Sequence, residues 1–289
     1  MSDFLSIFDF ALILSALRLA SPILLAALGG VLTDRAGIFN IGLEGQMLVG
    51  AFLGFAGLYW TGSAWLGLLF GVAGATALSL LFGLWVIKLK GDPIIVGLAV
   101  NLFAIGLTAY LTMPVFGVQG SYDDPALEGL PRLLGFSPLV YLAALAVPAL
   151  WWLLFKHPLG IRLRAVGEDA EAASEAAIHP ARVQFIACAL CGVLCGLAGA
   201  QLALSLVTQW VQGMTAGRGF IALVAIMLAR SHPVGAAAAA LLFGLAYAMA
   251  VRLQGIGIPP QFVSMLPYLL TIAVLVLLAR RLRNRPVTT

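Results

Sequence analysis

The feature that most limits how this chain can fold is the repetition of apolar runs of about 20 residues along the sequence. An α-helix of about 20 predominantly apolar residues crosses a hydrocarbon core about 30 Å thick. The composition agrees, with 62% hydrophobic residues, 10% charged residues and a mean hydropathy of +1.05. Soluble domains carry roughly 25% charged residues. We therefore predict an all-α polytopic membrane protein that forms a single transmembrane domain over 1–289.

The apolar runs predict about nine membrane-spanning helices, within limits of eight to ten. They cover 19–33, 41–60, 64–87, 93–112, 138–155, 182–204, 216–230, 234–251 and 263–280. The segment before Arg18 is apolar but is interrupted by Arg18 and Ser21-Pro22, so we expect it to lie along the interface with Arg18 reaching the head groups. The count depends most on the short 216–230 run, since a re-entrant segment there would reduce it to eight.

Basic residues fall unequally on the two sides of this topology, and the side richer in Lys and Arg is normally cytoplasmic. Of the 16 basic residues, 12 fall on one side: Arg35, Lys88, Lys90, Lys156, Arg162, Arg164, Arg182, Arg230, Arg280, Arg281, Arg283 and Arg285. The other side has Arg18, Arg132, Arg218, Arg252 and an acidic loop within about 113–137. We expect that loop and the N-terminus outside and the C-terminus in the cytoplasm. The N-terminal segment lacks the basic start of a signal peptide and is expected to be retained.

Polar side chains in or beside the predicted spans are candidates for a solute pathway, because such residues in membranes normally face protein or a water-filled cavity. The candidates are Asn40, Glu44, Gln46, Asn101, Gln201 and Gln209. For Glu44 a structural alternative stays open: Asn40 would cap the second helix, Glu44 would lie near the inner interface, and Asp34 would pair with Arg35 or another basic residue. For Arg218 the alternatives are an outer gate, a contact with a binding protein, or an interface anchor.

The longest predicted cytoplasmic loop, about 162–181, contains the Ala- and Glu-rich segment EDAEAASEAA at 168–177. Good helix formers predict a short helix that ends before His179-Pro180. Three glutamates would share one face and leave a smooth alanine surface. From the spacing alone this is either a solvated connector or a helix that docks on a cytoplasmic partner.

Cysteine and histidine positions favour packing and helix boundaries over chemistry. Cys188, Cys191 and Cys195 lie along one side of an apolar helix, and buried cysteine behaves as a small hydrophobic residue. The three histidines each precede a proline, so we interpret them as boundaries of helices. The sequence predicts no metal site and no catalytic residues, and its basic residues at span ends argue against a nucleic-acid partner.

Three segments resemble the permease subunits of bacterial ABC importers in the branched-chain amino acid, ribose and nucleoside group. They read TDRAGIFNIGLEGQMLVGAF, RLRAVGEDAEAASEAAIHPARVQ and GRGFIALVAIMLARSHPVGAAAAALLFG. The likeness covers nearly the whole chain in order. It is strongest to permeases that import nucleosides with basic-membrane-protein-type lipoproteins, and simple-sugar permeases of the ribose type are the rival.

The resemblance implies a type II importer bundle in the bacterial cytoplasmic (inner) membrane. Its expected partners are a second permease, usually as a heterodimer, a cytoplasmic ATPase, an extracytoplasmic substrate-binding lipoprotein and the lipid bilayer. It assigns docking on the ATPase to Gly167, Glu168, Asp169, Ala172, Ala173 and Ala176. The chain has no G-x-x-x-x-G-K-[ST] motif, so we expect no cofactor here and ATP with Mg²⁺ on the partner ATPase.

Two other classes compete with an ABC permease. A secondary transporter needs an ion or proton site near the midplane, and Glu44 is the only acidic residue within a predicted span. A membrane-embedded enzyme would need a nucleophile with a base or a histidine-rich metal motif, and no such set converges in the sequence.

Overall fold

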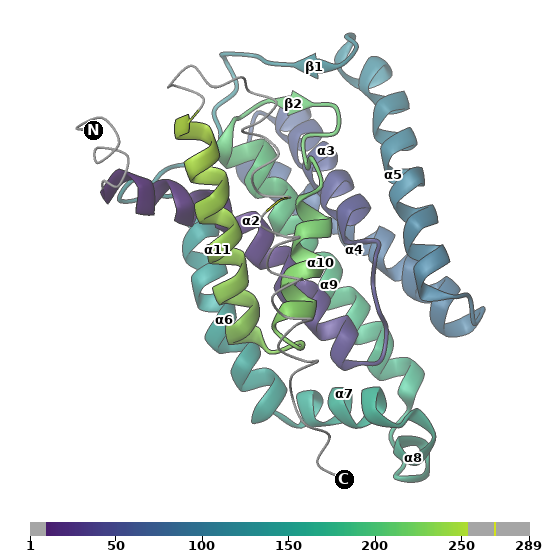
Figure 1. Ribbon diagram of the computed structural model, residues 1–289. Helices are drawn as coiled ribbons and strands as arrows, with labels where there is room; N and C mark the ends of the chain where they lie inside the picture. The colour runs from purple at the N-terminus through teal and green to yellow at the C-terminus, as the bar shows by residue number, and fades with distance from the viewer. Residues whose placement is uncertain (1–9, 254–268, 270–289) are drawn as a thin grey trace.

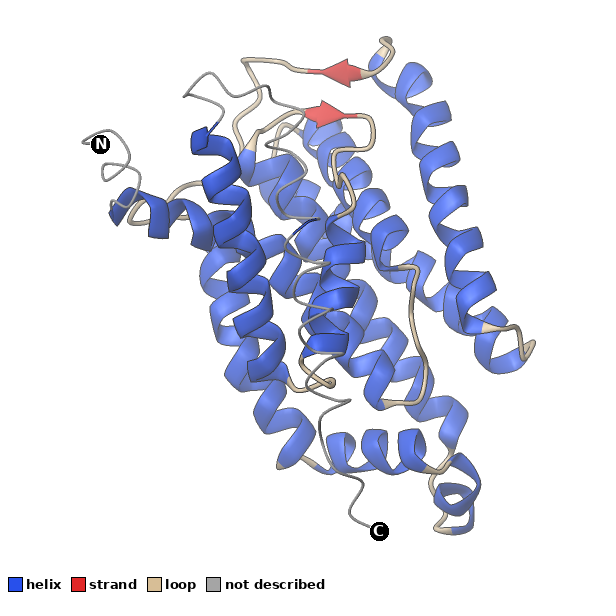
Figure 2. Ribbon diagram, in the orientation of Figure 1, coloured by secondary structure: helices blue, strands red, loops and turns tan. Residues whose placement is uncertain are grey.

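Long apolar helices packed side by side form the protein, which the computed structural model describes at residues 10–253 and 269 (Figure 1, Figure 2). The helices are α2 (Phe10–Arg35), α3 (Leu43–Thr61), α4 (Ala64–Gly83), α5 (Pro93–Phe116), α6 (Pro138–Phe155), α7 (Pro158–Glu168), α8 (Ala170–Glu175), α9 (Pro180–Gln201), α10 (Arg218–Leu228) and α11 (Pro233–Leu253). Single π-helical turns, η1 (Leu84–Lys88) and η2 (Leu202–Leu206), extend α4 and α9. The strands β1 (Ser121–Tyr122) and β2 (Trp210–Val211) form one antiparallel pair.

Six of these elements are long and apolar enough to cross a membrane. They are Ala11–Arg35, Ala64–Lys88, Pro93–Phe116, Pro138–Phe155, Pro180–Leu206 and Pro233–Leu253. The predicted helical bundle is therefore confirmed, with small shifts of boundaries. The largest shift is in the first span, because α2 is continuous from Phe10 through Pro22 rather than starting at 19. The predicted span 263–280 lies outside the described residues.

Two further crossings are only partly helical. In the 36–61 segment, residues 36–42 form a loop that leads from the end of the bundle that carries α7 into its interior, where α3 begins (Figure 1). The second crossing follows β2 and runs toward the end of the bundle that carries α7. It becomes helical only at Arg218. Because α10 has 11 residues, it is about 16 Å long, roughly half of a hydrocarbon core. The predicted 216–230 helix is thus too long, and the segment crosses rather than re-enters.

Helix α3 lies at the centre of the bundle, and its packing explains how it tolerates polar residues. Fifteen of its 19 residues are buried, among them Glu44 and Gln46. Close approach to α4 and α9 depends on glycine: a Cβ on Gly50 would lie 2.9 Å from Gly196 Cα, and one on Gly71 would lie 2.5 Å from Gly50 O. Small residues at these positions let the helix backbones approach closely, as is usual between packed membrane helices.

The two ends of the bundle differ. At one end β1 and β2 meet, and an aromatic cluster of Phe52, Phe55, Tyr59, Phe116 and Tyr122 fills the space beneath them. We call this the strand end. At the other end α7 lies across the ends of the long helices, with the short α8 beside it (Figure 1). We call this the α7 end.

Candidate transport site and coupling surface

The carboxylate of Glu44 caps the start of α10. Its Oε1 accepts the backbone N–H of Gly217 at 2.8 Å, and its Oε2 accepts that of Gly219 at 2.6 Å. A carboxylate at a helix N-terminus accepts hydrogen bonds from backbone N–H groups that have no partner within the helix. The positive end of the helix dipole also stabilises its negative charge. The fit requires glycine, since a Cβ on Gly219 would lie 2.5 Å from Glu44 Cα, and Gly217 has φ +77°.

Glu44 lies well inside the bundle rather than at its inner surface. The other end of α10 is followed by Arg230 and Ser231, whose carbonyls accept hydrogen bonds from the Arg35 guanidinium at the α7 end. The N-terminus of α10 is about 16 Å from there. The alternative that placed Glu44 beside the predicted cytoplasmic loop therefore does not hold, because the 36–42 loop carries the start of α3 into the bundle.

Asn101 of α5 caps α3 from a neighbouring helix. Its Oδ1 accepts the N–H of Gly45 at 2.8 Å, and its Nδ2 donates to the carbonyl of Ile41 at 3.0 Å. Asn40 was expected to be this cap, but its Oδ1 accepts the N–H of Gly42 at 2.9 Å, before the helix begins. Asn40 therefore shapes the loop that enters α3.

Gln46 lies beneath this loop and is fully buried. Its Oε1 lies 3.4 Å from Asn40 Nδ2 and 3.7 Å from Cys191 Sγ. Within the described residues, the Nε2 of Gln46 has no hydrogen-bond partner. Asn40, Glu44, Gln46 and Asn101 thus gather at the start of α3, where most of their polar atoms hold the broken backbone together.

Gln201 lies in a different part of the bundle, toward the strand end. Its Oε1 accepts the hydroxyl of Ser137 at 2.7 Å, and its Nε2 donates to Ser21 Oγ at 3.1 Å. Since Ser21 is on α2 and Ser137 precedes α6, this amide ties three helices together. Hydrogen-bonded side chains of this kind are common between packed membrane helices.

Gln209 is half-buried and lines an apolar recess of about 350 Å³. The other lining residues are Leu19, Leu202, Leu206, Val207, Val211, Met214, Ala216 and Arg218. Arg218 opens α10, donates to the carbonyls of Met214 and Thr215, and lies 5.1 Å from the centre of the Tyr247 ring. Arg218 is half-buried at the start of α10, about 16 Å of helix from the α7 end. Its roles as an outer gate, a contact with a binding protein or an interface anchor stay predictions.

Asp169 separates α7 from α8 and caps the second helix. Its carboxylate accepts the N–H groups of Glu171 and Ala172 at 2.9 and 3.0 Å. The segment was predicted as one helix over 168–177, but α7 runs to Glu168 and α8 ends at Glu175. The predicted alanine surface is also only partly correct, since Ala173 is buried in this chain while Ala172 and Ala176 are exposed.

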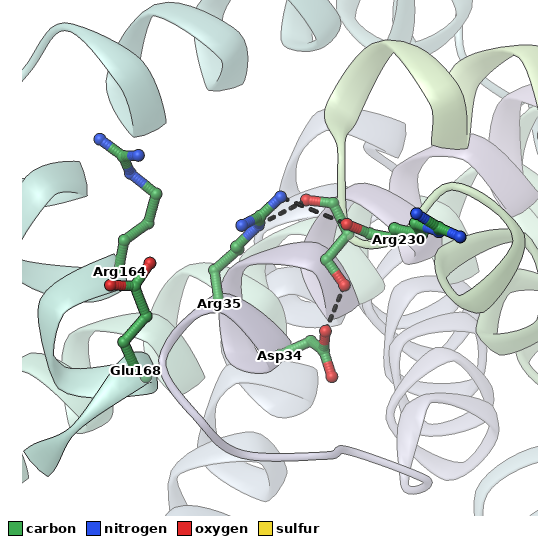
Figure 3. A pocket seen from close by; sticks show the side chains of 7 residues that line it. Asp34, Arg35, Arg164, Glu168 and Arg230 are labelled. Atoms are coloured by element: carbon green, nitrogen blue, oxygen red, sulfur yellow. Dashed lines mark hydrogen bonds between the residues drawn. The ribbon is translucent and has the colours of Figure 1, made fainter. Parts of the chain in front are cut away.

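The α7 end links three segments through Arg35 (Figure 3). Its Nε donates to the carbonyl of Ser231 at 2.8 Å and its Nη2 to that of Arg230 at 3.2 Å. The hydroxyl of Ser231 donates to Asp34, which was expected to pair with Arg35 or another basic residue. Gly167 packs on the same turn, where a Cβ would lie 2.2 Å from Arg35 O. We call these five residues the Arg35 junction.

The sequence of this helical bundle matches a family of transport proteins. Residues 12–275 match the model of the branched-chain amino acid transport system permease component family. The chain belongs to this family. It is an ABC permease and a multi-pass membrane protein.

The permease is similar to named ABC transporter permeases along most of its length. NupQ of Bacillus subtilis, a guanosine ABC transporter permease protein, is 34% identical over 89% of this chain and 88% of its own. NupC of Lactococcus lactis, a nucleoside ABC transporter permease protein, is 35% identical over 89% of each. TsgC13 of Haloferax volcanii, provisionally named a glucose ABC transporter permease protein, is 34% identical over 93% and 91%.

Two further similarities bear on assembly and fold. NupP, a second guanosine ABC transporter permease protein of Bacillus subtilis, is 28% identical over 79% of this chain and 70% of its own. A solved inward-facing ABC transporter, provisionally of the metal-chelate type, superposes with a TM-score of 0.53 at 19% identity, over 91% of the permease and 84% of that chain. The structural likeness shows that the permease shares the fold of that ABC transporter chain.

Sequence reasoning missed the two caps that organise the centre of the permease. The glycine pair around Arg218 was a visible signal, because glycines at a helix start mark a backbone that needs positive φ or close approach. Their partner Glu44 lies 175 residues away, and no local pattern pairs them. The histidines were predicted correctly as boundaries, since His157 and His179 are N-caps of α7 and α9, and His232 directly precedes α11.

Proposed function

We propose that this permease moves nucleosides inward across the bacterial cytoplasmic membrane, with ATP hydrolysis on a separate subunit. Two relatives whose names specify guanosine or nucleosides align over 89% of the chain, and this observation carries the substrate class. A nucleoside is neutral and polar, so it needs amide and hydroxyl partners rather than a charge. Gln209 beside an apolar recess offers that combination.

The solute passage in this proposal runs past the N-terminus of α10. Discontinuous membrane helices that begin near mid-depth are typical of transporter binding regions. Non-helical backbone at membrane depth is tolerated only where protein or a water-filled cavity surrounds it, and both broken crossings meet here. Gln209 would contact solute, Arg218 would shape the recess, and Glu44, Asn40 and Asn101 would hold the two helix starts. Gln46 would offer the solute an amide nitrogen that has no partner among the described residues. Gln201 would hold α2, α6 and α9 together toward the strand end.

Coupling in this proposal starts at the exposed face of α8. Glu168, Asp169, Ala172 and Ala176 would contact a cytoplasmic ATPase, while Gly167 and Ala173 would seat the segment on the permease. Because Gly167 touches the turn at Arg35, a shift of α7 would reach Ser231 and then α10. This mechanism places the α7 end and the C-terminus in the cytoplasm, ATP with Mg²⁺ on the ATPase, and the 113–137 loop outside.

The permease would act with a second permease of the same family and with an extracytoplasmic substrate-binding lipoprotein. The match to both NupQ and NupP of one organism supports a heterodimer. A simple-sugar importer is the second candidate, favoured by the 34% identity to TsgC13.

Uptake assays test both proposals. In a strain that lacks the gene, tritiated uridine, guanosine and ribose are offered with and without the restored permease and its ATPase. We expect restored nucleoside uptake that needs both subunits. Uptake of ribose alone would replace nucleosides with sugars as the substrate, and uptake without the ATPase would contradict an ABC mechanism.

A further inference from the structure

Arg18 lies toward the strand end of the bundle, beside Gly135 and Phe136. It is 17 residues from Arg35 along α2, which corresponds to about 25 Å of helix and nearly the thickness of a hydrocarbon core. The first turns of α2 project sideways from the bundle near the strand end (Figure 1). The guanidinium is fixed there: Nη2 donates to the carbonyl of Gly135 at 2.8 Å, and the group lies 5.5 Å from the Phe136 ring centre.

A polar pocket of about 70 Å³ surrounds this guanidinium. It is lined by Arg18, Arg132, Gly135, Ser137, Val140, Gln201, Ser205 and Leu206, a set with two cations and no acid. Its volume exceeds the ~10–15 Å³ that one water molecule needs. The pocket is therefore electropositive and large enough for a small anionic group.

Two buried donors in this wall have unused hydrogen-bonding capacity. Within the described residues, neither Arg18 Nε nor Ser205 Oγ has a hydrogen-bond partner. Buried polar groups are normally hydrogen-bonded, so each such atom calls for an explanation. Gln201 and Ser137 bond to each other and form the floor. An arginine and a serine that line one pocket suit an oxyanion, because a guanidinium matches phosphate oxygens in a bidentate geometry.

An apolar groove of about 230 Å³ adjoins the polar pocket. Arg18 and Leu206 line both spaces, and the groove continues over Leu19, Ala248 and Val251 between α2 and α11, with Ser15 and Arg252 at its rim. Val251 is 58% exposed, so the groove opens on the outer surface of the helices. An anion site and a hydrocarbon site thus meet at one arginine.

We propose that the pocket and the groove together hold one anionic phospholipid. Its phosphate would bind Arg18 Nε, Arg132 and Ser205, and one acyl chain would lie along Leu19, Leu206 and Val251. The depth of Arg18, the excess positive charge and the continuous apolar groove all match a head group joined to a chain. A soluble anion would leave the groove without an occupant, and water would leave the two cations without a counter-charge.

Native mass spectrometry of the purified, delipidated transporter complex tests this site. Phosphatidylglycerol, phosphatidylcholine, glycerol phosphate and inorganic phosphate are titrated separately. We expect one tightly retained phosphatidylglycerol per permease chain, weaker retention of zwitterionic phosphatidylcholine, and no comparable binding of the two anions without chains.

Three variants locate the site. Arg18→Gln and Arg132→Gln should each weaken phosphatidylglycerol retention roughly tenfold, because each loses a charged hydrogen bond to phosphate. Arg132 is exposed, so its substitution keeps the test valid even where Arg18→Gln lowers expression. Arg182→Gln is the matched control, since Arg182 is an exposed arginine in the first turn of α9 at the α7 end.

The outcomes separate the alternatives. Retention that falls in the two site variants and persists in Arg182→Gln supports the lipid site. Equal retention in all four proteins overturns it. Displacement of phosphatidylglycerol by an equal concentration of inorganic phosphate identifies a soluble anion and also overturns it, whereas equal retention of phosphatidylcholine overturns the selectivity for an anionic head group.

Discussion

The carboxylate of Glu44 on α3 accepts the backbone N–H of Gly219 on α10 at 2.6 Å, across 175 residues of sequence. This bond joins the starts of two helices that both begin inside the bundle, the second of them only 11 residues long. It makes the centre of the permease depend on one acidic side chain and on the absence of a Cβ beside it.

Replacing Glu44 with Gln should weaken this junction although the side chain keeps its size. The amide offers one oxygen to two N–H donors, so one backbone donor loses its partner. The expected cost is about 1–3 kcal/mol of stability. It should be visible as a lower melting temperature in detergent and as reduced nucleoside uptake. Glu128→Gln, in the loop at the strand end, is the control, and equal melting temperatures for both variants would contradict this role of Glu44.

Gly219→Ala should damage the same junction from the other side. An added Cβ would lie 2.5 Å from Glu44 Cα and force the two helix starts apart. Overpacking of this kind typically costs about 1–3 kcal/mol. Gly106→Ala on α5 is the matched control, since a Cβ there meets nothing within 4 Å. The control should be neutral or slightly stabilising, and a Gly219→Ala protein as stable as Gly106→Ala would refute the packing argument.

Asn101→Leu should destabilise the start of α3. The substitution removes the acceptor of the Gly45 N–H and the donor to Ile41 O, and loss of a helix cap costs about 0.5–2 kcal/mol. Thermal unfolding of the purified complex measures the effect. Thr108→Val, further along the same buried face of α5, removes a hydroxyl bonded only within its own helix and should cost less.

Ala172 and Ala173 should respond differently to the same substitution. Ala172→Lys changes an exposed position on α8, so we expect a stable permease that fails to retain the ATPase during purification. Ala173→Lys buries a charge against α7 and α9 and should lower the melting temperature of the permease itself. Full ATPase retention in Ala172→Lys would contradict the proposed coupling surface.

Arg35→Gln should separate ATPase docking from transport. The substitution removes charged donors to the carbonyls of Arg230 and Ser231 but leaves α8 unchanged. We expect the ATPase to co-purify normally while ATP-driven uptake falls about tenfold or more, because loss of even one charge-assisted hydrogen bond costs about 1.5–3 kcal/mol. Arg162→Gln, at an exposed position of α7 outside the Arg35 junction, is the control. Loss of uptake that always follows loss of ATPase binding would count against the junction as a transmitting element.

The amino-acid sequence by itself determined the membrane class, the long helices and most of their boundaries. The physical reason is local: an apolar run must cover about 30 Å of hydrocarbon, and prolines after His157, His179 and His232 fix where helices begin. Close helix packing also has a local signal, because the glycine spacings Gly50/Gly54 and Gly192/Gly196 let two helix backbones approach.

Only the tertiary structure decided where the polar residues act. Glu44, Gln46 and Asn101 read alike as polar residues near spans, yet one caps α10, one is buried beneath a loop and one caps α3 from α5. Similarly, Ala172 and Ala173 are adjacent alanines in the sequence, yet Ala172 is exposed and Ala173 is buried. A broken crossing satisfies its backbone groups with side chains from other helices, so its partners depend on packing between distant segments and not on any local pattern.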